Sequence, residues 1–159
     1  MRKALFPGTF DPFTLGHYDI VKRGLDLFDE VYVGIGVNSS KKNMFTEKER
    51  VEMIQACFPG EERLKVAAFK GLTVNFAKDN GIQFLLRGLR NGVDLEYEKP
   101  IALINRKLIA AMDTIFLLPD PETAHISSTL VREVIRYKGP VEALVPAAIA
   151  AWIDSKPRE

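Results

Sequence analysis

Five short runs rich in Val, Ile, Leu and Phe alternate along the chain with longer amphipathic stretches, and this alternation limits the possible folds more than any other feature. We expect strands at Lys3–Phe6, Val31–Val37, Leu64–Phe69, Ile82–Leu86 and Thr114–Leu118. Repeated β-α units of this kind are typical of a parallel sheet with helices on its faces. The sequence therefore predicts an α/β fold with a doubly wound, five-stranded parallel sheet.

The amphipathic stretches have recognisable helix ends. Thr46-Glu47-Lys48-Glu49 is a capping box that opens one helix. Pro100 lies inside the longest helical pattern, where it predicts a kink or a late start, because proline has no amide proton and crowds the preceding turn. We expect helices at His17–Phe28, Glu47–Phe58, Leu72–Asn80, Val93–Met112, Ser127–Tyr137 and Pro146–Asp154.

Composition excludes several classes of protein. With 47% apolar and 27% charged residues, and no linker, repeat or low-complexity segment, we expect a single domain over residues 1–159. No apolar run approaches the roughly 20 residues that span a bilayer, and the run in "MRKALF" is too short for a signal-peptide core, which favours the cytoplasm.

The 22 basic and 21 acidic residues give no long-range field for holding nucleic acid. The single cysteine, Cys57, is expected to be buried as a small hydrophobe.

A polar or glycine-containing segment follows every predicted strand. Because the carboxyl ends of parallel strands share one edge of the sheet, these segments are expected to meet where open α/β sheets bind ligands. They are "PGTFDPFTLGH" (7–17), "NSSKK" (38–42), "KGLT" (70–73), "RGLR" (87–90) and "PDPETAHISST" (119–129).

The residue types in these segments favour phosphate binding. Gly8 and Gly16 let backbone amides approach an anion, and a helix that starts near Gly16 directs free amide protons into the loop. His17, in the first helical turn, is a candidate hydrogen-bond donor to a phosphate. "ISST" places hydroxyl groups at another helix start, a second anion site. Candidate cations are Lys41, Arg87 and Arg90; a helical turn would bring the two arginines together.

Several motifs resemble a known family. Thr14-Leu15-Gly16-His17 resembles the His-x-Gly-His motif of the nucleotidyltransferases with Thr in the first position, and "ISST" resembles their late motif. With "RGLR" and "EYE", the chain resembles the phosphopantetheine adenylyltransferases, the bacterial-type enzymes of coenzyme A synthesis. The resemblance runs from "ALFPGTFDPFTLGH" through "SKKNMFTEKERV", "NFA" and "LLRGLRNGVDLEYE" to "ISSTLVREV". It implies a Rossmann-like nucleotidyltransferase fold.

The resemblance also implies an activity. Members transfer AMP from ATP to 4′-phosphopantetheine by in-line attack without a covalent intermediate, giving dephospho-coenzyme A and pyrophosphate. Magnesium accompanies ATP, coenzyme A is a feedback ligand, and the family forms homohexamers.

Roles for individual residues follow from the same resemblance. The catalytic residues would be His17, Lys41 and Arg87. ATP would be bound by Thr9, Phe10, His17, Gly88, Leu89, Arg90, Glu98, Thr123, Ala124, His125, Ile126, Ser127, Ser128 and Thr129. Phosphopantetheine would be bound by Thr9, Lys41, Thr73 and Arg87, and no residue is expected to bind a metal.

Structural interpretations of the same residues remain open. His17 can cap or pack a helix start, and Lys41 can belong to a solvated loop. His125 is a ligand contact or a loop residue. Arg87 and Arg90 can form a surface ion network with Asp94, Glu96 or Glu98, and Glu98 can be a helix surface residue. Ser127, Ser128 and Thr129 can cap a helix, and Gly34 and Gly36 are interpreted as close-packing positions in a strand.

Two functional alternatives also remain. The same chemistry can act on another acceptor, such as nicotinate mononucleotide or glycerol phosphate, or the fold can bind a nucleotide as a sensor without catalysis. The apolar faces late in the fourth helix and around Ala147–Ile153 can serve assembly contacts or core packing.

Overall fold

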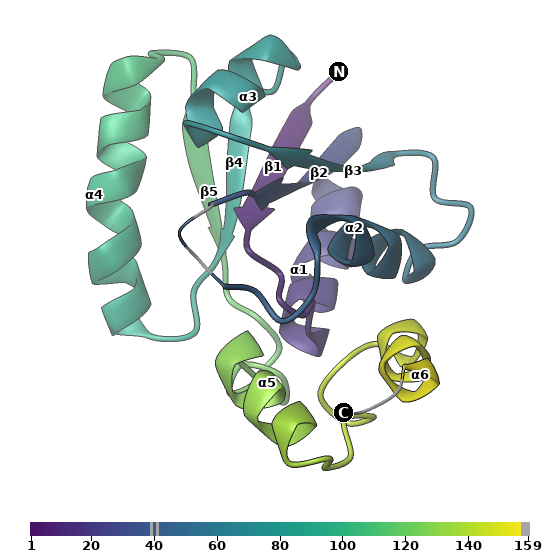
Figure 1. Cartoon of the computed structure of the whole chain (residues 1–159). Coiled ribbons are helices and arrows are strands. Elements are labelled where there is room, and N and C mark those ends of the chain that lie inside the picture. Colours follow the sequence, from purple (N-terminus) through teal and green to yellow (C-terminus); the bar gives the residue numbers. More distant parts are fainter. Residues whose placement is uncertain (39, 41, 157–159) are drawn as a thin grey trace.

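A five-stranded parallel sheet forms the centre of the molecule (Figure 1). The computed structural model describes residues 1–38, 40 and 42–156. The strands lie in the order β3-β2-β1-β4-β5, and neighbouring strands pair in parallel, which confirms the predicted fold class. In chain order the elements are β1 (Lys3–Gly8), α1 (Leu15–Leu27), β2 (Glu30–Gly36), α2 (Glu47–Ala56), β3 (Leu64–Phe69), α3 (Thr73–Asp79), β4 (Phe84–Gly88), α4 (Gly92–Leu108), β5 (Asp113–Leu117), α5 (Ser128–Arg136) and α6 (Ala147–Ser155).

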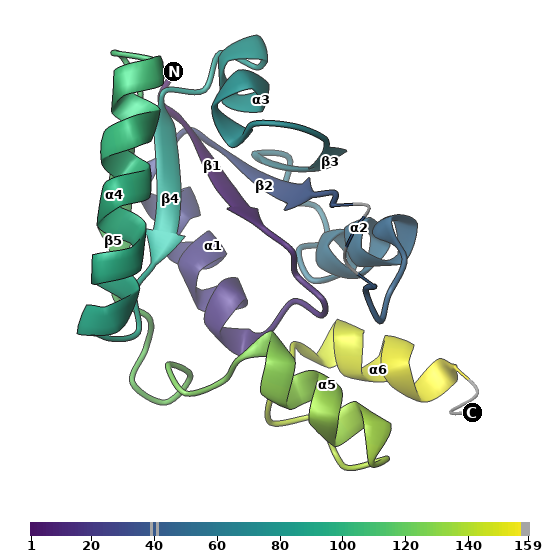
Figure 2. The ribbon, with the colours of Figure 1, turned by 60° about the vertical axis from the view of Figure 1, so that its left-hand side comes forward.

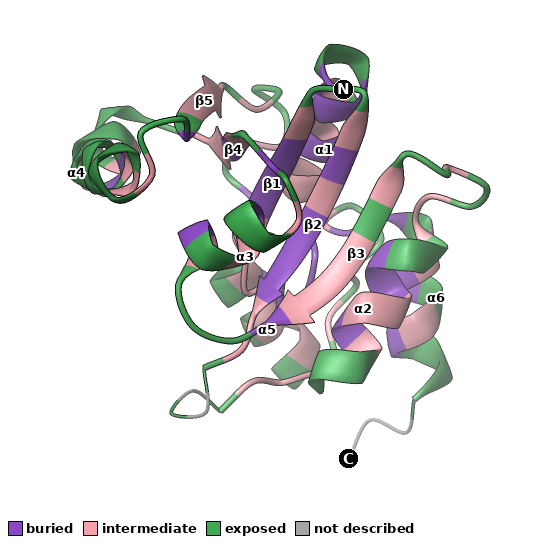
Figure 3. Ribbon diagram, turned by 90° about the horizontal axis from the view of Figure 1, so that it is seen from above, coloured by how far each residue is buried: buried purple, intermediate pink, exposed green. Residues whose placement is uncertain are grey.

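The two faces of the sheet pack into two separate apolar clusters, because successive strand residues point to opposite faces. Ala4 and Phe6 of β1 belong to the larger cluster, to which α1, α2 and α6 contribute. Leu5 belongs to the smaller cluster, with Ala77 of α3 and Met112. Figure 3 shows buried residues concentrated along β1 and β2. The sheet is therefore covered on both faces, as doubly wound folds require.

Helix α4 differs from the prediction at both ends. It begins at Gly92 and continues past Pro100, so the late start is wrong; Figure 2 shows one continuous helix beside β4 and β5. Pro100 and Glu96, whose carbonyl would otherwise accept the missing hydrogen bond, are both exposed, so water can replace that bond. The helix ends at Leu108, short of the predicted Met112. None of the helices in the described parts of the chain has the length and apolar character that crossing a membrane requires.

Cys57 lies just after α2 and is half-buried against the larger cluster. Burial raises the pKa of its thiol to about 12. The side chain therefore stays a protonated thiol and behaves as the small hydrophobe that the sequence predicts, although part of it remains exposed.

The strand order places a switch point between β1 and β4. Connections from β1 run toward β2, whereas those from β4 run toward β5, so the chain diverges at this pair. In open α/β sheets a crevice forms beyond the carboxyl ends of such a pair. Helices α5 and α6 lie beyond the same edge of the sheet (Figure 1).

Candidate active site

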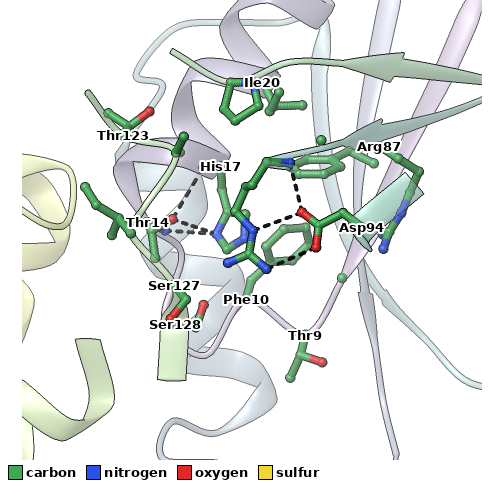
Figure 4. Close-up of a pocket in the computed structure, with 18 of the residues that line it drawn as sticks. Thr9, Phe10, Thr14, His17, Ile20, Arg87, Asp94, Thr123, Ser127 and Ser128 are labelled. Atoms are coloured by element: carbon green, nitrogen blue, oxygen red, sulfur yellow. Dashed lines mark hydrogen bonds and ion pairs between the residues drawn. The ribbon is translucent and has the colours of Figure 1, made fainter. Parts of the chain in front are cut away.

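A pocket of about 350 Å³ opens at the switch point between β1 and β4. Its wall is formed by the end of β1 and the following loop, the start of α1, the end of β4 with α4, and the turn that leads to α5. Figure 4 shows Thr14, His17 and Phe10 grouped within this pocket, with Ser127 and Ser128 beside them. Three of the five polar segments predicted at this edge therefore converge on one cavity.

His17 is fixed by the capping interactions at the start of α1. The backbone N–H of Thr14 donates to Nδ1 of His17 at 3.0 Å, and the Thr14 hydroxyl oxygen accepts from the backbone N–H of His17 at 3.4 Å. A ring nitrogen that accepts a hydrogen bond carries no proton, so the proton of the neutral imidazole is on Nε2. The cap therefore leaves Nε2–H as the donor that His17 can offer to a ligand in the pocket.

The surroundings of His17 keep its imidazole neutral. Burial, followed by the positive charges of Arg87 and Arg90, lowers the pKa of His17 from 6.5 to about 4. Aromatic rings supply much of this apolar environment, with ring centroids 5.0 to 6.0 Å from that of the imidazole: Phe6, Phe10 and Phe13. At neutral pH the ring can therefore donate a hydrogen bond, but it carries no charge and no spare proton.

Arg87 and Arg90 line the same pocket, but they do not share a helical turn. Arg87 belongs to β4, whereas Arg90 precedes α4. Nε of Arg87 donates to Glu98 at 2.9 Å, its Nη2 binds the other carboxylate oxygen, and its Nη1 donates to the carbonyl of Pro7 at 2.5 Å. Nε of Arg90 lies 3.2 Å from a carboxylate oxygen of Asp94. Two of the ion pairs weighed in the sequence, Arg87 with Glu98 and Arg90 with Asp94, are thus present, and they lie in the wall of the pocket.

The loop after β1 is fixed by buried charged residues that the sequence analysis did not single out. The carboxylate of Asp11 accepts from the backbone N–H groups of Met44 and Phe45 at 2.8 and 2.9 Å. Arg50 donates to the carbonyl of Thr9 at 2.6 Å. Asp11 and Arg50 expose only 3% and 2% of their surface. These contacts fix the backbone of Thr9, which lines the pocket, although neither charged side chain lines it.

The start of α5 forms another part of the wall. The hydroxyl of Ser127 accepts from the backbone N–H of Leu130 at 3.3 Å, so Ser127 caps the helix. The hydroxyl of Ser128 donates to the carbonyl of Pro12 at 2.8 Å. Both serines line the pocket, so capping and a place in the wall coexist.

A second pocket, of about 300 Å³, adjoins the first. The two pockets share Pro7, Arg87 and Glu98 as lining residues. Thr73 at the start of α3 and Asn105 of α4 line the second pocket only. The Arg87–Glu98 ion pair therefore lies between the two cavities. One ligand can occupy the cavity on each side of the Arg87 guanidinium.

Comparisons with known proteins show the family to which the chain belongs. Residues 5–134 match the family model described as cytidylyltransferase-like. A phosphopantetheine adenylyltransferase of Flavobacterium johnsoniae is 52% identical over 149 residues, which cover 94% of this chain and 97% of that protein. The chain belongs to the phosphopantetheine adenylyltransferase family. A more distant member, from Leptospira biflexa, is 43% identical over 96% of both chains.

A solved structure supports the fold of this adenylyltransferase family member independently of sequence. A bifunctional NMN adenylyltransferase/ADP ribose pyrophosphatase from Francisella tularensis superposes with a TM-score of 0.75 at 13% identity. The match covers 96% of this chain and 48% of that protein. At this identity the likeness concerns the fold alone.

Most residues predicted from the family motifs lie in the two pockets. Those lining the first pocket are Thr9, Phe10, His17, Arg87, Gly88, Arg90, Glu98, Thr123, Ala124, Ile126, Ser127 and Ser128. Thr73 lines the second pocket. Lys41 lies outside the described residues. The ligand contacts of all these residues stay predictions.

Three predicted ATP contacts lie apart from the first pocket. Leu89 is buried, with 7% of its surface exposed, and Thr129 lies in the first turn of α5 without lining the pocket. His125 lines a separate apolar cavity beside α5, together with Leu130 and Tyr137. For His125, the described structure therefore places the side chain as a loop residue next to a different cavity.

Proposed function

We propose that this member of the family transfers the adenylyl group of ATP to 4′-phosphopantetheine, giving dephospho-coenzyme A and pyrophosphate. One observation carries the proposal: His17 offers Nε2–H at the start of α1 in a pocket that Arg87 and Arg90 also line. A helix start, a fixed neutral donor and two guanidinium groups are together suited to a polyphosphate. Family membership supplies the acceptor.

The reaction needs positioning and charge stabilisation rather than a protein nucleophile. The phosphate of 4′-phosphopantetheine attacks the α-phosphorus of ATP in line, a new P–O bond forms, and pyrophosphate leaves with the electrons of the bond that breaks. His17 donates from Nε2 to an α-phosphate oxygen as charge rearranges there. Because burial and the arginines lower its pKa to about 4, His17 stays neutral and acts through the hydrogen bond, not through proton transfer.

Each substrate takes one of the two adjoining pockets. The triphosphate and adenosine occupy the first pocket, against Arg90 and the turn before α5, and the pantetheine arm extends into the second pocket toward Thr73. Arg87 lies between them and can contact the attacking phosphate. Lys41, outside the described residues, would approach the same phosphate from the loop after β2.

Magnesium enters with ATP as part of the substrate. The carboxylates that line the first pocket, Asp94 and Glu98, are each paired with an arginine. The described residues contain no group of three or more His, Cys, Asp or Glu side chains arranged to hold a metal ion. The cation would therefore be held mainly by triphosphate oxygens, the ligand type that Mg²⁺ prefers.

The acceptor is tested by comparing three candidate acceptors in parallel reactions. Purified protein is supplied with ATP and magnesium together with 4′-phosphopantetheine, nicotinate mononucleotide or glycerol phosphate, and released pyrophosphate is measured. We expect release with 4′-phosphopantetheine only. Release with another acceptor would assign a different substrate, and ATP binding without release in any arm would leave a nucleotide sensor.

We also propose feedback binding and assembly for this chain. Coenzyme A, which carries the pantetheine arm of the product, would bind the two pockets as a feedback ligand and compete with 4′-phosphopantetheine. The enzyme would work in the cytoplasm as a homohexamer.

A further inference from the structure

The turn formed by residues 118–124, the 118–124 turn, closes one side of the first pocket. Pro119, Thr123 and Ala124 of this turn line the pocket. The backbone N–H groups of Thr123 and Ala124 both donate to the carbonyl of Asp120 at 2.9 Å. The placement of Asp120 therefore decides where Thr123 and Ala124 lie.

Two charged side chains of α1 hold this turn from outside the pocket. Oδ2 of Asp19 accepts from the backbone N–H of Asp120 at 3.2 Å. Nη1 of Arg23 donates to the carbonyl of Leu118. The same nitrogen lies 3.4 Å from Oδ2 of Asp19, so the two side chains also pair with each other across one helical turn. One acceptor and one donor thus bind complementary backbone groups of the turn.

Helix α1 therefore carries His17 and also anchors the neighbouring part of the pocket wall. The turn lies close to the start of the helix, since a Cβ atom at Gly16 would be 3.4 Å from the carbonyl oxygen of Thr123. Neither Asp19 nor Arg23 lines the pocket. Their contacts can influence ligands only through the position of the turn.

We propose that Asp19 and Arg23 form a clamp, the Asp19–Arg23 clamp, that positions the 118–124 turn relative to His17 for nucleotide binding. The proposal rests on the proposed function, because it assigns the turn to the ATP side of the site. The clamp consists of positioning residues and takes no part in the chemical step. Its loss should weaken ATP binding while His17 remains in place.

A double variant with exchanged charges distinguishes the contacts that the clamp makes with the turn from the ion pair between its two side chains. The double variant Asp19→Arg with Arg23→Asp keeps opposite charges four residues apart on α1, but it presents a donor to the N–H of Asp120 and an acceptor to the carbonyl of Leu118. We expect KM for ATP to rise about three- to tenfold and kcat to change less than about twofold. Asp19→Asn keeps an oxygen acceptor for Asp120 and should retain most of the ATP affinity.

The matched control exchanges an exposed ion pair that lines neither pocket. Lys48 and Glu52 of α2 are also four residues apart, with nitrogen and oxygen at 3.8 Å and side chains 86% and 41% exposed. Exchanging their charges should leave KM and kcat unchanged. If the Asp19–Arg23 exchange also leaves KM for ATP unchanged while the wild type is active, the clamp is refuted.

Amide hydrogen exchange tests the clamp without any assay of activity. In the Asp19–Arg23 exchange variant, amides of residues 120–124 should exchange faster than in the wild type, while the central strands stay equally protected. Unchanged exchange in this segment would overturn the proposal. A wild type that releases no pyrophosphate would instead refute the proposed function. The amide hydrogen-exchange measurement would still test whether the clamp holds the turn.

Discussion

His17 combines two hydrogen-bonding tasks in one ring: Nδ1 accepts at the cap of α1, and Nε2–H is left for a ligand. In His17→Ala both are lost. We expect turnover to fall at least about 100-fold, the scale of losing one preorganised donor to a developing charge. ATP affinity should change little, because the contact strengthens only as the α-phosphate reacts. Pyrophosphate release and calorimetric titration with ATP measure the two quantities.

The variant His17→Gln distinguishes the effect of losing the Nε2–H donor from the effect of losing the capping hydrogen bond of α1. Glutamine three residues after a threonine cap can still accept from the cap N–H, so the free energy of unfolding should stay near that of the wild type. Its turnover should nevertheless fall, because the amide does not place a donor where Nε2 lies. Near-normal turnover in His17→Ala would remove His17 from the mechanism.

The lowered pKa of His17 also predicts a pH dependence of stability. Its folded value of about 4 lies below the ordinary 6.5, so between these values the unfolded chain binds more protons at this residue than the folded one does. The contribution of His17 to the free energy of unfolding therefore falls as the pH drops from 6.5 to 4. Urea unfolding at pH 7 and pH 4.5 should show a larger loss for the wild type than for His17→Gln. Equal losses would contradict the buried neutral imidazole.

Local sequence predicts residues whose partners are close along the chain. The position of His17 at a helix start follows from Thr14-Leu15-Gly16-His17, since the cap is three residues away. Asp11 could not be predicted in its anchoring role, because it binds the backbone 33 and 34 residues further on. Arg50 reaches Thr9 across 41 residues. Such contacts depend on how elements pack, which no short motif encodes.

At the scale of elements, Gly34 shows why β2 needs a glycine. A Cβ atom there would lie 2.7 Å from Cδ1 of Leu5 and 3.0 Å from the ring of Phe69, and both neighbours are buried. Gly34→Ala should therefore lower the free energy of unfolding by about 1–3 kcal/mol. At Gly36 the nearest ring atom of Phe69 is 3.8 Å away, an ordinary contact, so Gly36→Ala should be nearly neutral. Urea denaturation compares the two, and equal costs would contradict the close-packing role of Gly34.

The sequence predicts most elements correctly because their apolar patterns coincide with buried faces. Val31, Val33 and Ile35 of β2 are fully buried on one face, and they belong to an apolar run that is typical of a strand. The pattern fails at the end of α4, since Met112 is apolar and buried yet packs on the sheet after the helix has ended. An apolar residue that is buried just after a helix therefore extends the apolar pattern of that helix, and the sequence places the end of the helix too late.

At the scale of the whole molecule, the apolar faces of α4 and α6, for which the sequence allowed either core packing or assembly contacts, differ in burial. In α6, Ile149, Ala150 and Ile153 are buried in the larger cluster, so this face serves the core. In α4, Glu98 is the buried residue of the helix, whereas Leu103 and Ile104 expose 60% and 58% of their surface. Sequence alone could not separate these cases, because both helices carry apolar side chains that suit either a core or an interface, and the packing of the chain decides which face is covered.

The exposed face of α4 gives the proposed assembly a specific test. Leu103→Lys combined with Ile104→Lys places charges on a face that is exposed in the single chain, so far-ultraviolet circular dichroism should remain unchanged. If this face joins copies of the chain, sedimentation equilibrium should show about six chain masses for the wild type and a smaller species for the variant. Leu130→Lys on α5 alters an equally exposed leucine, 55% accessible, and should leave the mass unchanged. A wild-type monomer would refute the hexamer, and dissociation caused by Leu130→Lys alone would move the interface to α5.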